Sequence, residues 1–459
     1  MTSIEDPGTG PSRGSHRLEP GPSAPPAPGR LASRVVPLAE PLDPLDLAGE
    51  DGFVWRSAAG TLVGTGVAAR VPVGTGPGRI ERAAERVATL LAATEVRDSD
   101  GSGLTPAAVG ALPFHPANPA ELVVPSVLLR TDPEGRTWAV VTEPGEFETP
   151  SPDELVGRRR AATARGRAWP AARRLDAEGL WTTNSIPPAG APASPTGLDR
   201  WRAGVLAALA AIGSGRLDKV VLAREAEVEA EWPFPRAELL RRLERRPGGA
   251  TFLYASGGFV GASPELLVRR QGRVAVSRPM AGTVPQGDAA GGEADGLARL
   301  TGSPKEAVEH RLVVDAVAEG LAKVADRVEV GRPEVVRLAT VAHLATEITA
   351  ELTGPLPTAL ELAGLLHPTP AVGGSPRDAA LAAIAALEPF DRGRYAGPVG
   401  WVDRAGDGEW AVALRGASLD GRHARLLAGA GIVPGSDPDA EWDETEAKLE
   451  PMLRAIVRP

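Results

Sequence analysis

The chain contains no cysteine in its 459 residues. This excludes disulfide bonds, a thiol nucleophile and cysteine-ligated zinc or iron–sulfur sites. Its uninterrupted apolar runs, such as 204–212 and 379–387, are far shorter than the roughly 20 residues that a membrane-spanning helix needs. Residues 1–30 lack an apolar segment after a basic start, so they do not resemble a secretory signal. We therefore expect a cytoplasmic protein that does not enter a membrane.

Lysine is almost as scarce, since only four of the 50 basic residues are lysine and the other 46 are arginine. A retained lysine indicates a need for an amine that can lose its proton near neutral pH. The alternative is that the four survive by chance. Together with 59 acidic residues the basic set gives a net charge of −9, which argues against general nucleic-acid binding. The lysines are Lys219, Lys305, Lys323 and Lys448.

The first part of the chain has a weak structural pattern. Residues 1–30 contain seven prolines and five glycines without periodic apolar positions, and we interpret residues 1–40 as a disordered tail. Residues 41–195 show only short strand-like runs and one helical stretch over 80–93. A Pro/Ala/Ser/Gly-rich stretch at 184–197 precedes the strongly patterned residues 196–459, as a loop within one domain or, alternatively, as a linker.

The second part alternates between strands and helices, with hairpin-like pairs near 401–412 and 418–424. This mixture predicts one large α+β domain over residues 41–459, with an extensive, mainly antiparallel β-sheet and surrounding helices. No dinucleotide-binding or phosphate-loop motif occurs, so nucleotide binding has no support. The expected strands are 219–228, two strands that flank the turn at 261–265, 274–278, 335–352, 397–403, 409–419 and 422–433. The expected helices are 202–212, 236–245, 304–326, 357–366, 376–387 and 438–457.

The helix over 304–326 carries a candidate metal ligand. The sequence Ser-Pro-Lys-Glu at 303–306 predicts its start, as a capping box with proline at the first helical position. Glu309 falls within or beside the apolar face that contains Val313 and Val317. A carboxylate on a buried face is costly unless it is paired or binds a metal. A buried salt bridge and exposure at the helix edge are the alternatives.

The last helix has a polar face made of Glu441, Glu444, Thr445 and Lys448. Taken alone, Glu444 and Lys448 form an ordinary helix-stabilising pair. The preceding segment 426–433 is rich in alanine and glycine, and it would let the backbone approach a ligand closely. Carboxylates with no nearby pair of Cys or His favour magnesium over zinc.

Two further residues are candidates for acid–base chemistry. Lys219 leads a strand, 219–224, that is apolar on both faces, and desolvation there favours the neutral amine that a base requires. Glu265 follows the apolar run 259–262 in a turn, where burial would keep it protonated as an acid. An exposed strand end and a surface turn are the respective alternatives.

Taken together, these segments resemble the chorismate-using enzymes, and the isochorismate synthases most closely. The resemblance extends from Trp201 to Ile456, more than half of the chain. Each motif is weak alone, but their number and order are typical of this family. The motifs are Lys-Val-Val-Leu-Ala-Arg (219–224), Ser-Pro-Glu-Leu-Leu (263–267), Met-Ala-Gly-Thr (280–283), Glu-His (309–310), His-Leu-Ala-Thr (343–346), Leu-His-Pro-Thr-Pro-Ala-Val-Gly-Gly (366–374), Glu-Pro-Phe-Asp-Arg (388–392), Tyr-Ala-Gly-Pro-Val-Gly-Trp (395–401), Ala-Gly-Ala-Gly-Ile-Val (428–433) and Glu-Trp-Asp-Glu-Thr-Glu-Ala-Lys (441–448).

The resemblance implies a chorismate-binding domain and a Mg²⁺-dependent, reversible conversion of chorismate to isochorismate. In this reading Lys219 is the base that activates water for attack at ring carbon C2, and Glu265 is the acid that protonates the departing C4 hydroxyl. Glu309 and Glu444 match the family's metal carboxylates, and Glu441 would reach the ion through water. The metal would hold the ring carboxylate of chorismate.

The resemblance also implies a set of substrate-binding positions. Lys448 and the backbone around Gly282 and Thr283 would help to hold the ring carboxylate. Tyr395 and Arg415 would hold the enolpyruvyl carboxylate. The remaining substrate positions are His343, Ala371 and Gly429.

Two segments depart from the family pattern. The helix opening commonly reads Ser-x-Lys-Asp-Arg-x-Glu-His, whereas residues 303–310 read Ser-Pro-Lys-Glu-Ala-Val-Glu-His. The loop after Thr283 usually carries arginine, whereas residues 284–286 are Val-Pro-Gln. Both changes lie near the expected metal and substrate entry, so we expect substrate affinity or loop closure to differ from the family. The acid, base and metal positions are intact.

Related activities fit less well. Aminodeoxychorismate synthases carry a lysine where this chain has Ala281, and anthranilate synthases lack the lysine that matches Lys219. A salicylate synthase, which adds pyruvate elimination, is the main alternative, followed by a catalytically silent homologue that acts as a binding subunit. We expect a monomer without a glutaminase subunit. Isochorismate serves both siderophore and menaquinone biosynthesis, and the sequence does not distinguish these uses.

Overall fold

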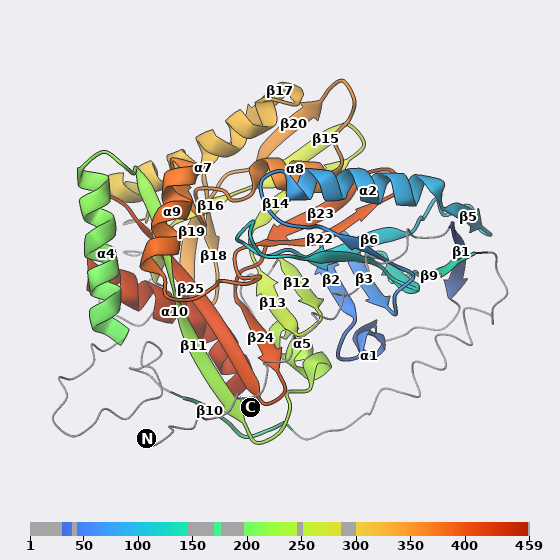
Figure 1. Ribbon diagram of the computed structural model, residues 1–459, viewed down its shortest axis with the longest axis horizontal. Helices are drawn as coiled ribbons and strands as arrows, with labels where there is room; N and C mark the ends of the chain where they lie inside the picture. The colour runs from blue at the N-terminus through green and yellow to red at the C-terminus, as the bar shows by residue number, and fades with distance from the viewer. Residues whose placement is uncertain are drawn as a thin grey trace, which may run out of the picture.

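The computed structural model describes residues 30–38, 44–145, 169–175, 197–245, 251–285 and 300–457 (Figure 1). Most of the expected tail and nearly all of the Pro/Ala/Ser/Gly-rich stretch at 184–197 lie outside the described residues. The described chain forms two large β-sheets, one small β-sheet and helices packed around them.

The largest sheet has 13 strands and combines both parts of the chain. Its central pairing, β12 with β2, joins the motif-bearing part to the weakly patterned part, so the two belong to one domain. Among the described strands only β1 and β5 pair in parallel, and all other pairs are antiparallel. In order, the strands are β10 (Ala172–Arg174), β11 (Lys219–Ala230), β25 (His423–Ile432), β24 (Gly416–Asp420), β13 (Phe259–Ser263), β12 (Phe252–Ser256), β2 (Phe53–Ser57), β3 (Gly60–Thr65), β8 (Val127–Thr131), β9 (Thr137–Pro144), β1 (Leu31–Leu38) and β5 (Glu95–Asp98), with β21 (Gly374–Ser375) beside β11.

Two further sheets complete the β-structure. A three-stranded sheet has the order β16 (Met280–Pro285), β19 (Val341–Ala345) and β18 (Glu334–Arg337). The other has nine strands, in the order β17 (Ala325–Val330), β20 (Ile348–Leu352), β15 (Val274–Arg278), β14 (Leu266–Gln271), β23 (Gly408–Val412), β22 (Pro398–Asp403), β6 (Ala107–Ala111), β7 (Glu121–Val124) and β4 (Ala69–Pro72).

The two large sheets pack face to face. Trp55 and Tyr254 of the 13-stranded sheet share one hydrophobic cluster with Val399 and Ala411 of the nine-stranded sheet, and all four are completely buried. Side chains alternate between the two faces of a strand, so each strand buries one row of apolar side chains between the sheets. This burial stabilises both sheets.

Helices cover the outer faces of the sheets. α8 (Ala359–Leu366), whose start is fixed by a capping box between Thr358 and Glu361, packs against α2 (Arg79–Ala93) and the nine-stranded sheet. At the other end of the molecule, α4 (Gly197–Gly213), α9 (Arg377–Leu387) and α10 (Pro438–Val457) pack against β11 and β25 (Figure 1). The remaining helices are α1 (Pro44–Ala48), α5 (Arg236–Glu244) and α7 (Pro304–Ala322), the last of which packs on β16.

Several expected boundaries need correction. β1 lies inside the segment that we assign to the tail, and its eight-residue pairing with β9 places the start of the folded chain ahead of residue 41. The helix expected over 304–326 ends at Ala322, because the chain enters β17 three residues later. The strand expected over 335–352 is three strands, β18 to β20, and β16 is an additional strand that the sequence pattern does not predict.

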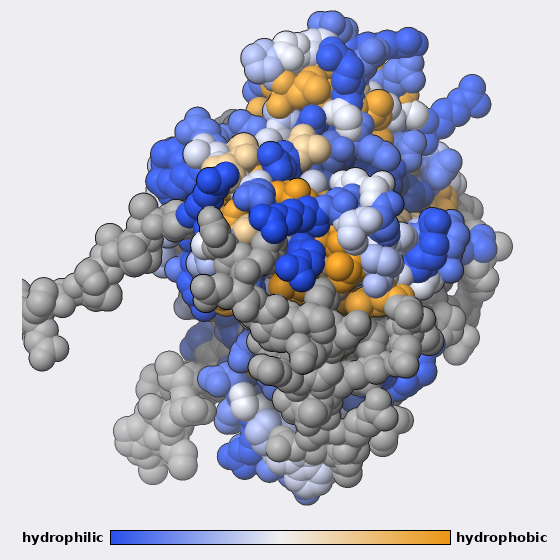
Figure 2. All heavy atoms as spheres, turned by 90° about the vertical axis from the view of Figure 1, so that its right-hand side faces the viewer, coloured by the Kyte–Doolittle hydropathy of each residue, from blue (hydrophilic) through white to orange (hydrophobic). Residues whose placement is uncertain are grey.

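The surface is largely hydrophilic. In Figure 2 the described part of one face shows mainly blue, hydrophilic side chains with hydrophobic ones between them. Within the described residues, no helix combines the length and the apolar composition that a membrane crossing needs.

Candidate active site

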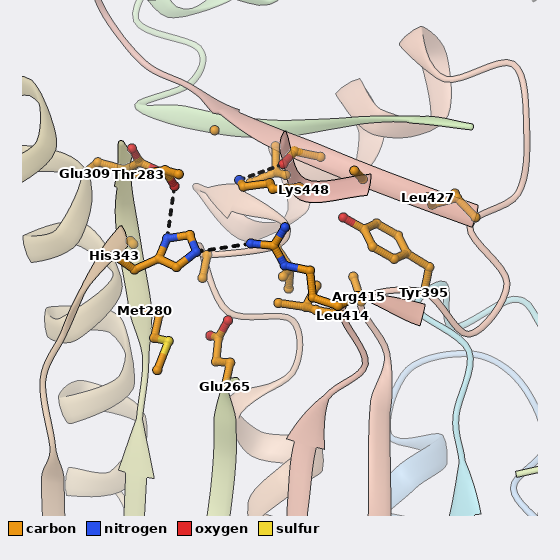
Figure 3. A pocket seen from close by; sticks show the side chains of 18 residues that line it. Glu265, Met280, Thr283, Glu309, His343, Tyr395, Leu414, Arg415, Leu427 and Lys448 are labelled. Carbon is orange, nitrogen blue, oxygen red and sulfur yellow. Dashed lines mark hydrogen bonds between the residues drawn. The ribbon is translucent and has the colours of Figure 1, made fainter. Parts of the chain in front are cut away.

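A pocket lies between the 13-stranded sheet, the three-stranded sheet, α7 and α10 (Figure 3). Nine of the predicted site residues line it: Glu265, Thr283, Glu309, His343, Ala371, Tyr395, Arg415, Gly429 and Lys448. The other lining residues are Val221, Met280, Ala281, Val372, Ala396, Leu414, Leu427, Ala428 and Gly431. Motifs that are far apart in the chain therefore meet at one pocket, whereas four of the predicted site residues do not line it: Lys219, Gly282, Glu441 and Glu444.

Lys219 reaches this pocket through Glu309. The Lys219 side chain is completely buried, so the alternative of an exposed strand end is wrong. Its Nζ lies 2.8 Å from Glu309 Oε1, across the contact between β11 and α7. Burial alone would raise the pKa of Glu309, but Lys219 and the more distant Lys448 and Lys305 outweigh it and hold that pKa below its usual value. Glu309 is therefore an anion beside the amine.

Gly431 makes room for this ion pair. A Cβ atom at residue 431 would lie 2.4 Å from Glu309 Oε1 and 3.0 Å from Lys219 Cε, closer than side-chain atoms normally approach. The sequence pattern predicts that the small residues of 426–433 admit a ligand. In the structure, the glycine at 431 admits the protein's own charged pair, which the pattern alone does not reveal.

Glu265 has the properties of a proton donor. It follows β13 and is 3% exposed, so the alternative of a surface turn is wrong. Burial raises its pKa to about 8, although the Met280 N–H, Lys219 and Lys448 favour the carboxylate. The carboxyl group is therefore protonated at neutral pH and points into the pocket (Figure 3).

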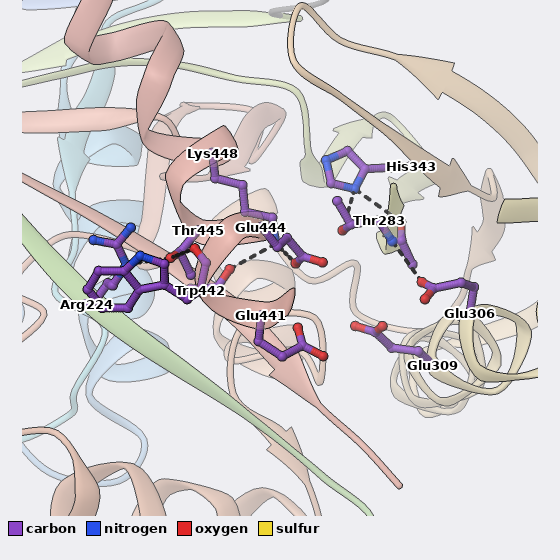
Figure 4. A network of polar contacts seen from close by, with 12 residues as sticks. Arg224, Thr283, Glu306, Glu309, His343, Glu441, Trp442, Glu444, Thr445 and Lys448 are labelled. Atoms are coloured by element: carbon purple, nitrogen blue, oxygen red, sulfur yellow. Dashed lines mark hydrogen bonds and ion pairs between the residues drawn. The ribbon is translucent and has the colours of Figure 1, made fainter. Parts of the chain in front are cut away.

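The carboxylates of Glu309, Glu441 and Glu444 approach one another between α7 and α10 (Figure 4). Burial, together with the negative charges of Glu441 and Glu309, raises the pKa of Glu444 to about 7 even though Lys448 lies beside it. Hard oxygen donors of this kind suit Mg²⁺ in their chemistry. Among the described residues, however, no three His, Asp or Glu side chains are gathered closely enough to hold an ion.

Each of these carboxylates is instead ion-paired to a lysine. Besides the Lys219–Glu309 pair, Lys448 Nζ lies 2.6 Å from Glu444 Oε1, and Lys305 Nζ lies 2.9 Å from Glu441 Oε1. Lys448 also donates to Gly429 O at 2.9 Å. The carboxylates Glu441, Glu306 and Glu309 hold the pKa of Lys305 above its usual value although burial opposes them. The oxygen donors are of the chemical kind that a divalent cation takes, and in this structure a lysine pairs with each of them.

His343 links Thr283 of strand β16 to Arg415. Arg415 Nη2 lies 3.3 Å from His343 Nε2, and since a guanidinium only donates, Nε2 is the acceptor. Burial and the positive charge of Arg415 keep the pKa of His343 well below its usual value, so the ring is neutral and carries its proton on Nδ1. Nδ1 then donates to Gly282 O at 3.2 Å or to Thr283 Oγ1 at 3.1 Å.

Arg415 presents an unused donor to the pocket. Its Nη1 is buried and has no hydrogen-bond partner among the residues that the structure describes. Burial lowers the pKa of Arg415 to about 10, so the guanidinium keeps its charge at neutral pH. Tyr395 lies near it in the same wall (Figure 3). A Cβ at Gly429 would lie 3.3 Å from the Tyr395 hydroxyl, so glycine keeps this wall open. The wall suits a carboxylate ligand.

Sequence reasoning missed the position of the Glu306 side chain. Ser303 caps α7 as expected, accepting from Glu306 N. The reciprocal half of the expected capping box is absent, because Glu306 Oε2 accepts from Thr283 N at 2.9 Å instead. Gly282, with φ of 76°, permits this approach, since a Cβ there would lie 3.1 Å from Glu306 Oε2. This contact joins Glu306, which belongs to one departure from the family pattern, to Thr283, which directly precedes the other at 284–286. Residue 286 lies outside the described chain.

The polar face expected on α10 divides between two environments. Glu444 and Lys448 face the pocket region, whereas Thr445 is completely buried against Arg224 of β11. The Arg224 guanidinium lies 3.8 Å from the centre of the Trp442 ring and pairs with Glu446 (Figure 4). These contacts fix the rotation of α10 and hence the direction of its carboxylates.

The pocket combines a protonated carboxyl group, a buried amine, a carboxylate cluster and an unpaired guanidinium donor, which together define an enzyme site for an anionic substrate. The chain matches the family model described as "Chorismate binding enzyme" over residues 31–457, and it belongs to the chorismate-binding enzymes.

Individual relatives agree with this family. Isochorismate synthase DhbC of Bacillus subtilis is 36% identical over 416 residues, which cover 88% of this chain and 93% of the relative. Putative isochorismate synthase MenF of Mycobacterium tuberculosis is 38% identical over 370 residues, 77% of this chain and 87% of the relative. The structure of MenF, the menaquinone-specific isochorismate synthase from Escherichia coli, superposes with a TM-score of 0.74 at 25% identity and covers 95% of this chain and 97% of that one.

Proposed function

We propose that this protein is an isochorismate synthase, an isomerase that converts chorismate to isochorismate. The observation that carries the proposal is a protonated Glu265 in a pocket that is also lined by the cationic Arg415 and Lys448. A buried Lys219 contacts the same pocket through Glu309. Acid–base chemistry on an anion needs these two functions and positive charge around them. The similarity to isochorismate synthases over most of the chain supports the same reaction.

In the proposed reaction, the oxygen of water adds at ring carbon C2 and the C4 hydroxyl leaves as water, while the ring double bonds shift between these carbons. Lys219, which is ion-paired with Glu309 in this structure, has to lose its proton first, and the neutral amine then takes a proton from the attacking water. Glu265 gives its proton to the departing C4 hydroxyl, which leaves as water. The raised pKa of Glu265, caused by burial, keeps that proton available at neutral pH.

The two carboxylates of chorismate are proposed to bind at opposite sides of the pocket. The free Nη1 of Arg415 and the hydroxyl of Tyr395 suit the enolpyruvyl carboxylate. Lys448 suits the ring carboxylate. The Thr283 N–H, proposed for the same carboxylate, donates to Glu306 Oε2 in this structure, so Glu306 has to release it before the backbone around Gly282 and Thr283 can bind the substrate. His343 contacts both Arg415 and Thr283 of β16 and so holds them together. Ala371 and Gly429 are small and leave space for the ring.

Glu309, Glu444 and Glu441 are the residues that would hold a magnesium ion, the last of them through water. When bound, the ion would neutralise the carboxylates and attract the ring carboxylate of the substrate. Support comes from the hard oxygen donors and from the pKa of Glu444, which is raised by burial first and then by the negative charges of Glu441 and Glu309.

A product assay tests the proposal. The purified protein is incubated with chorismate and Mg²⁺, the products are separated, and pyruvate is measured. Isochorismate without pyruvate is the expected result. Salicylate with stoichiometric pyruvate would establish a salicylate synthase instead, and no turnover would indicate a silent binding subunit.

A matched pair of variants tests the base. Lys219→Ala should abolish turnover with the fold intact, as judged by circular dichroism. Lys323→Ala is the control, because Lys323 caps the end of α7 through its backbone and its side chain is exposed. Near-normal activity of Lys219→Ala would remove Lys219 as the base.

A further inference from the structure

Three of the four lysines in the chain are each paired with one proposed metal ligand. The distances from Nζ to the carboxylate oxygen are 2.8 Å for Lys219–Glu309, 2.6 Å for Lys448–Glu444 and 2.9 Å for Lys305–Glu441. The pairs join different elements: β11 to α7, α10 to itself, and α7 to α10. Amines from the chain thus balance the negative charge of the cluster.

Lys305 differs from the other two lysines of this set. Lys448 lines the pocket and Lys219 contacts its wall through Glu309, and both have proposed roles in the reaction. Lys305 does not line the pocket, and its side chain is 32% exposed. Its partner Glu441 is only 3% exposed, so the carboxylate is far more desolvated than the amine. The reaction scheme leaves Lys305 without a function.

We propose that Lys305 is an internal counter-ion that competes with the divalent cation for Glu441 and thereby sets the affinity of the protein for the metal. The inference rests on the proposed metal assignment of the preceding section. A cation that approaches Glu441 meets the positive charge of Lys305 and has to share or displace it. A weaker affinity follows than the three carboxylates alone would give.

Removal of the Lys305 charge should raise the affinity for the metal in two ways. The metal-free protein is left with a buried, unpaired carboxylate at Glu441, which costs stability. The bound cation no longer meets a neighbouring ammonium, which favours the metal-bound state. Metal affinity should therefore rise as metal-free stability falls. A lysine that only supported the packing of α7 on α10 would lower stability without raising metal affinity.

The experiment uses the full-length protein without chorismate. Mg²⁺ and Mn²⁺ binding is measured by isothermal titration calorimetry, and Tm is measured with and without Mg²⁺ at one fixed pH. Three variants are compared with the wild type: Lys305→Met, which removes the charge but keeps the length; Lys305→Arg, which keeps the charge; and Lys323→Met, the exposed lysine at the end of the same helix.

Lys305→Met should bind Mg²⁺ roughly ten-fold more tightly than the wild type, which corresponds to about 1.4 kcal/mol. The Tm of Lys305→Met without metal should be lower than that of the wild type. Addition of Mg²⁺ should raise the Tm of the variant by more than it raises the Tm of the wild type. Lys305→Arg and Lys323→Met should bind Mg²⁺ with the affinity of the wild type. In a Glu441→Gln background, Lys305→Met should give a smaller gain.

Two results would overturn the inference in distinguishable ways. If Lys305→Met lowers Tm but binds Mg²⁺ with unchanged or weaker affinity, Lys305 is only a packing residue, and the proposed function is unaffected. If the wild type and all variants bind neither cation, the metal assignment itself fails, and the inference fails with it.

Discussion

Lys219 and Glu309 place the amine proposed as base 2.8 Å from a carboxylate proposed as metal ligand. The pair joins β11 to α7, so two motifs 90 residues apart in the chain depend on each other for their charge. Neither side chain is freely exposed: Lys219 is fully buried and Glu309 is 12% exposed. A change that displaces one member should therefore disturb the other.

Gly431→Ala tests this dependence while Lys219 and Glu309 themselves are not substituted. The new Cβ would lie 2.4 Å from Glu309 Oε1 and 3.0 Å from Lys219 Cε, so the pair has to move. We expect kcat to fall at least about ten-fold, because misplaced catalytic groups lose much of their effect. Steady-state kinetics and circular dichroism provide the measurement.

Gly213→Ala is the matched control, since nothing lies within 4 Å of a Cβ at that position. It should leave kcat unchanged. Unchanged kinetics in Gly431→Ala would mean that the pair has no part in turnover.

Glu265→Gln should alter the pH dependence of stability. The folded-state pKa of about 8, raised by burial, lies above the ordinary value of 4.5, so folding favours the protonated carboxyl. The wild type therefore loses stability as pH rises from about 4.5 to about 8, whereas glutamine does not titrate. One pKa unit is worth about 1.4 kcal/mol, so the variant should gain a few kcal/mol relative to wild type across this range.

Urea unfolding at about pH 5 and about pH 8 measures this difference, and activity provides a second readout. The variant should be inactive at every pH, and the wild-type kcat/KM should decline above about pH 8 as Glu265 loses its proton. A stability difference that is the same at both pH values would contradict the raised pKa.

The sequence predicts most elements of the motif-bearing part, because caps and periodicity are local. The cap at Ser303 is present as expected, and the strand expected over 422–433 is β25. β16 was missed, because Met-Ala-Gly-Thr has no alternation and its strand is defined by pairing with β19. β1 was missed for the same reason, since the strand with which it pairs, β9, lies far away in sequence.

The candidate site was predictable in its members but not in its contacts. Burial of Lys219 and Glu265 follows from apolar neighbours in sequence, which is why both were found. The partner of each lysine depends on how α7 and α10 pack, and no local pattern encodes it. Glu306 shows the limit most clearly, because the capping-box pattern is satisfied in sequence while its carboxylate binds Thr283.

Arg415→Lys should separate substrate binding from turnover. The free Nη1 is lost, and a shorter ammonium cannot offer both donors of the guanidinium. A hydrogen bond to a charged group is worth about 1.5–3 kcal/mol, so KM for chorismate should rise roughly ten- to 100-fold with a smaller change in kcat. Arg311→Lys, at an exposed position on α7, is the control and should leave both constants unchanged. An unchanged KM in Arg415→Lys would exclude Arg415 from substrate binding.

Arg392→Met should destabilise the protein and loosen the pocket wall together. Arg392 pairs with Glu388 at 2.6 Å, and both side chains are at most 3% exposed. The guanidinium also donates to Val372 O and Val221 O, whose residues line the pocket. Removing it leaves Glu388 buried and unpaired, which should cost about 3–5 kcal/mol in the free energy of unfolding. KM for chorismate should increase as well.

Two comparisons make this last prediction specific to the buried pair. Arg70→Met breaks the exposed Arg70–Glu121 pair and should cost less than about 1 kcal/mol in urea unfolding. The double variant Arg392→Met/Glu388→Gln should recover part of the lost stability, because the unpaired charge is gone. It should not recover KM, because the hydrogen bonds to Val221 and Val372 stay broken. Full recovery of both would mean that Arg392 acts only through the charge of Glu388, and that these backbone contacts do not position the wall.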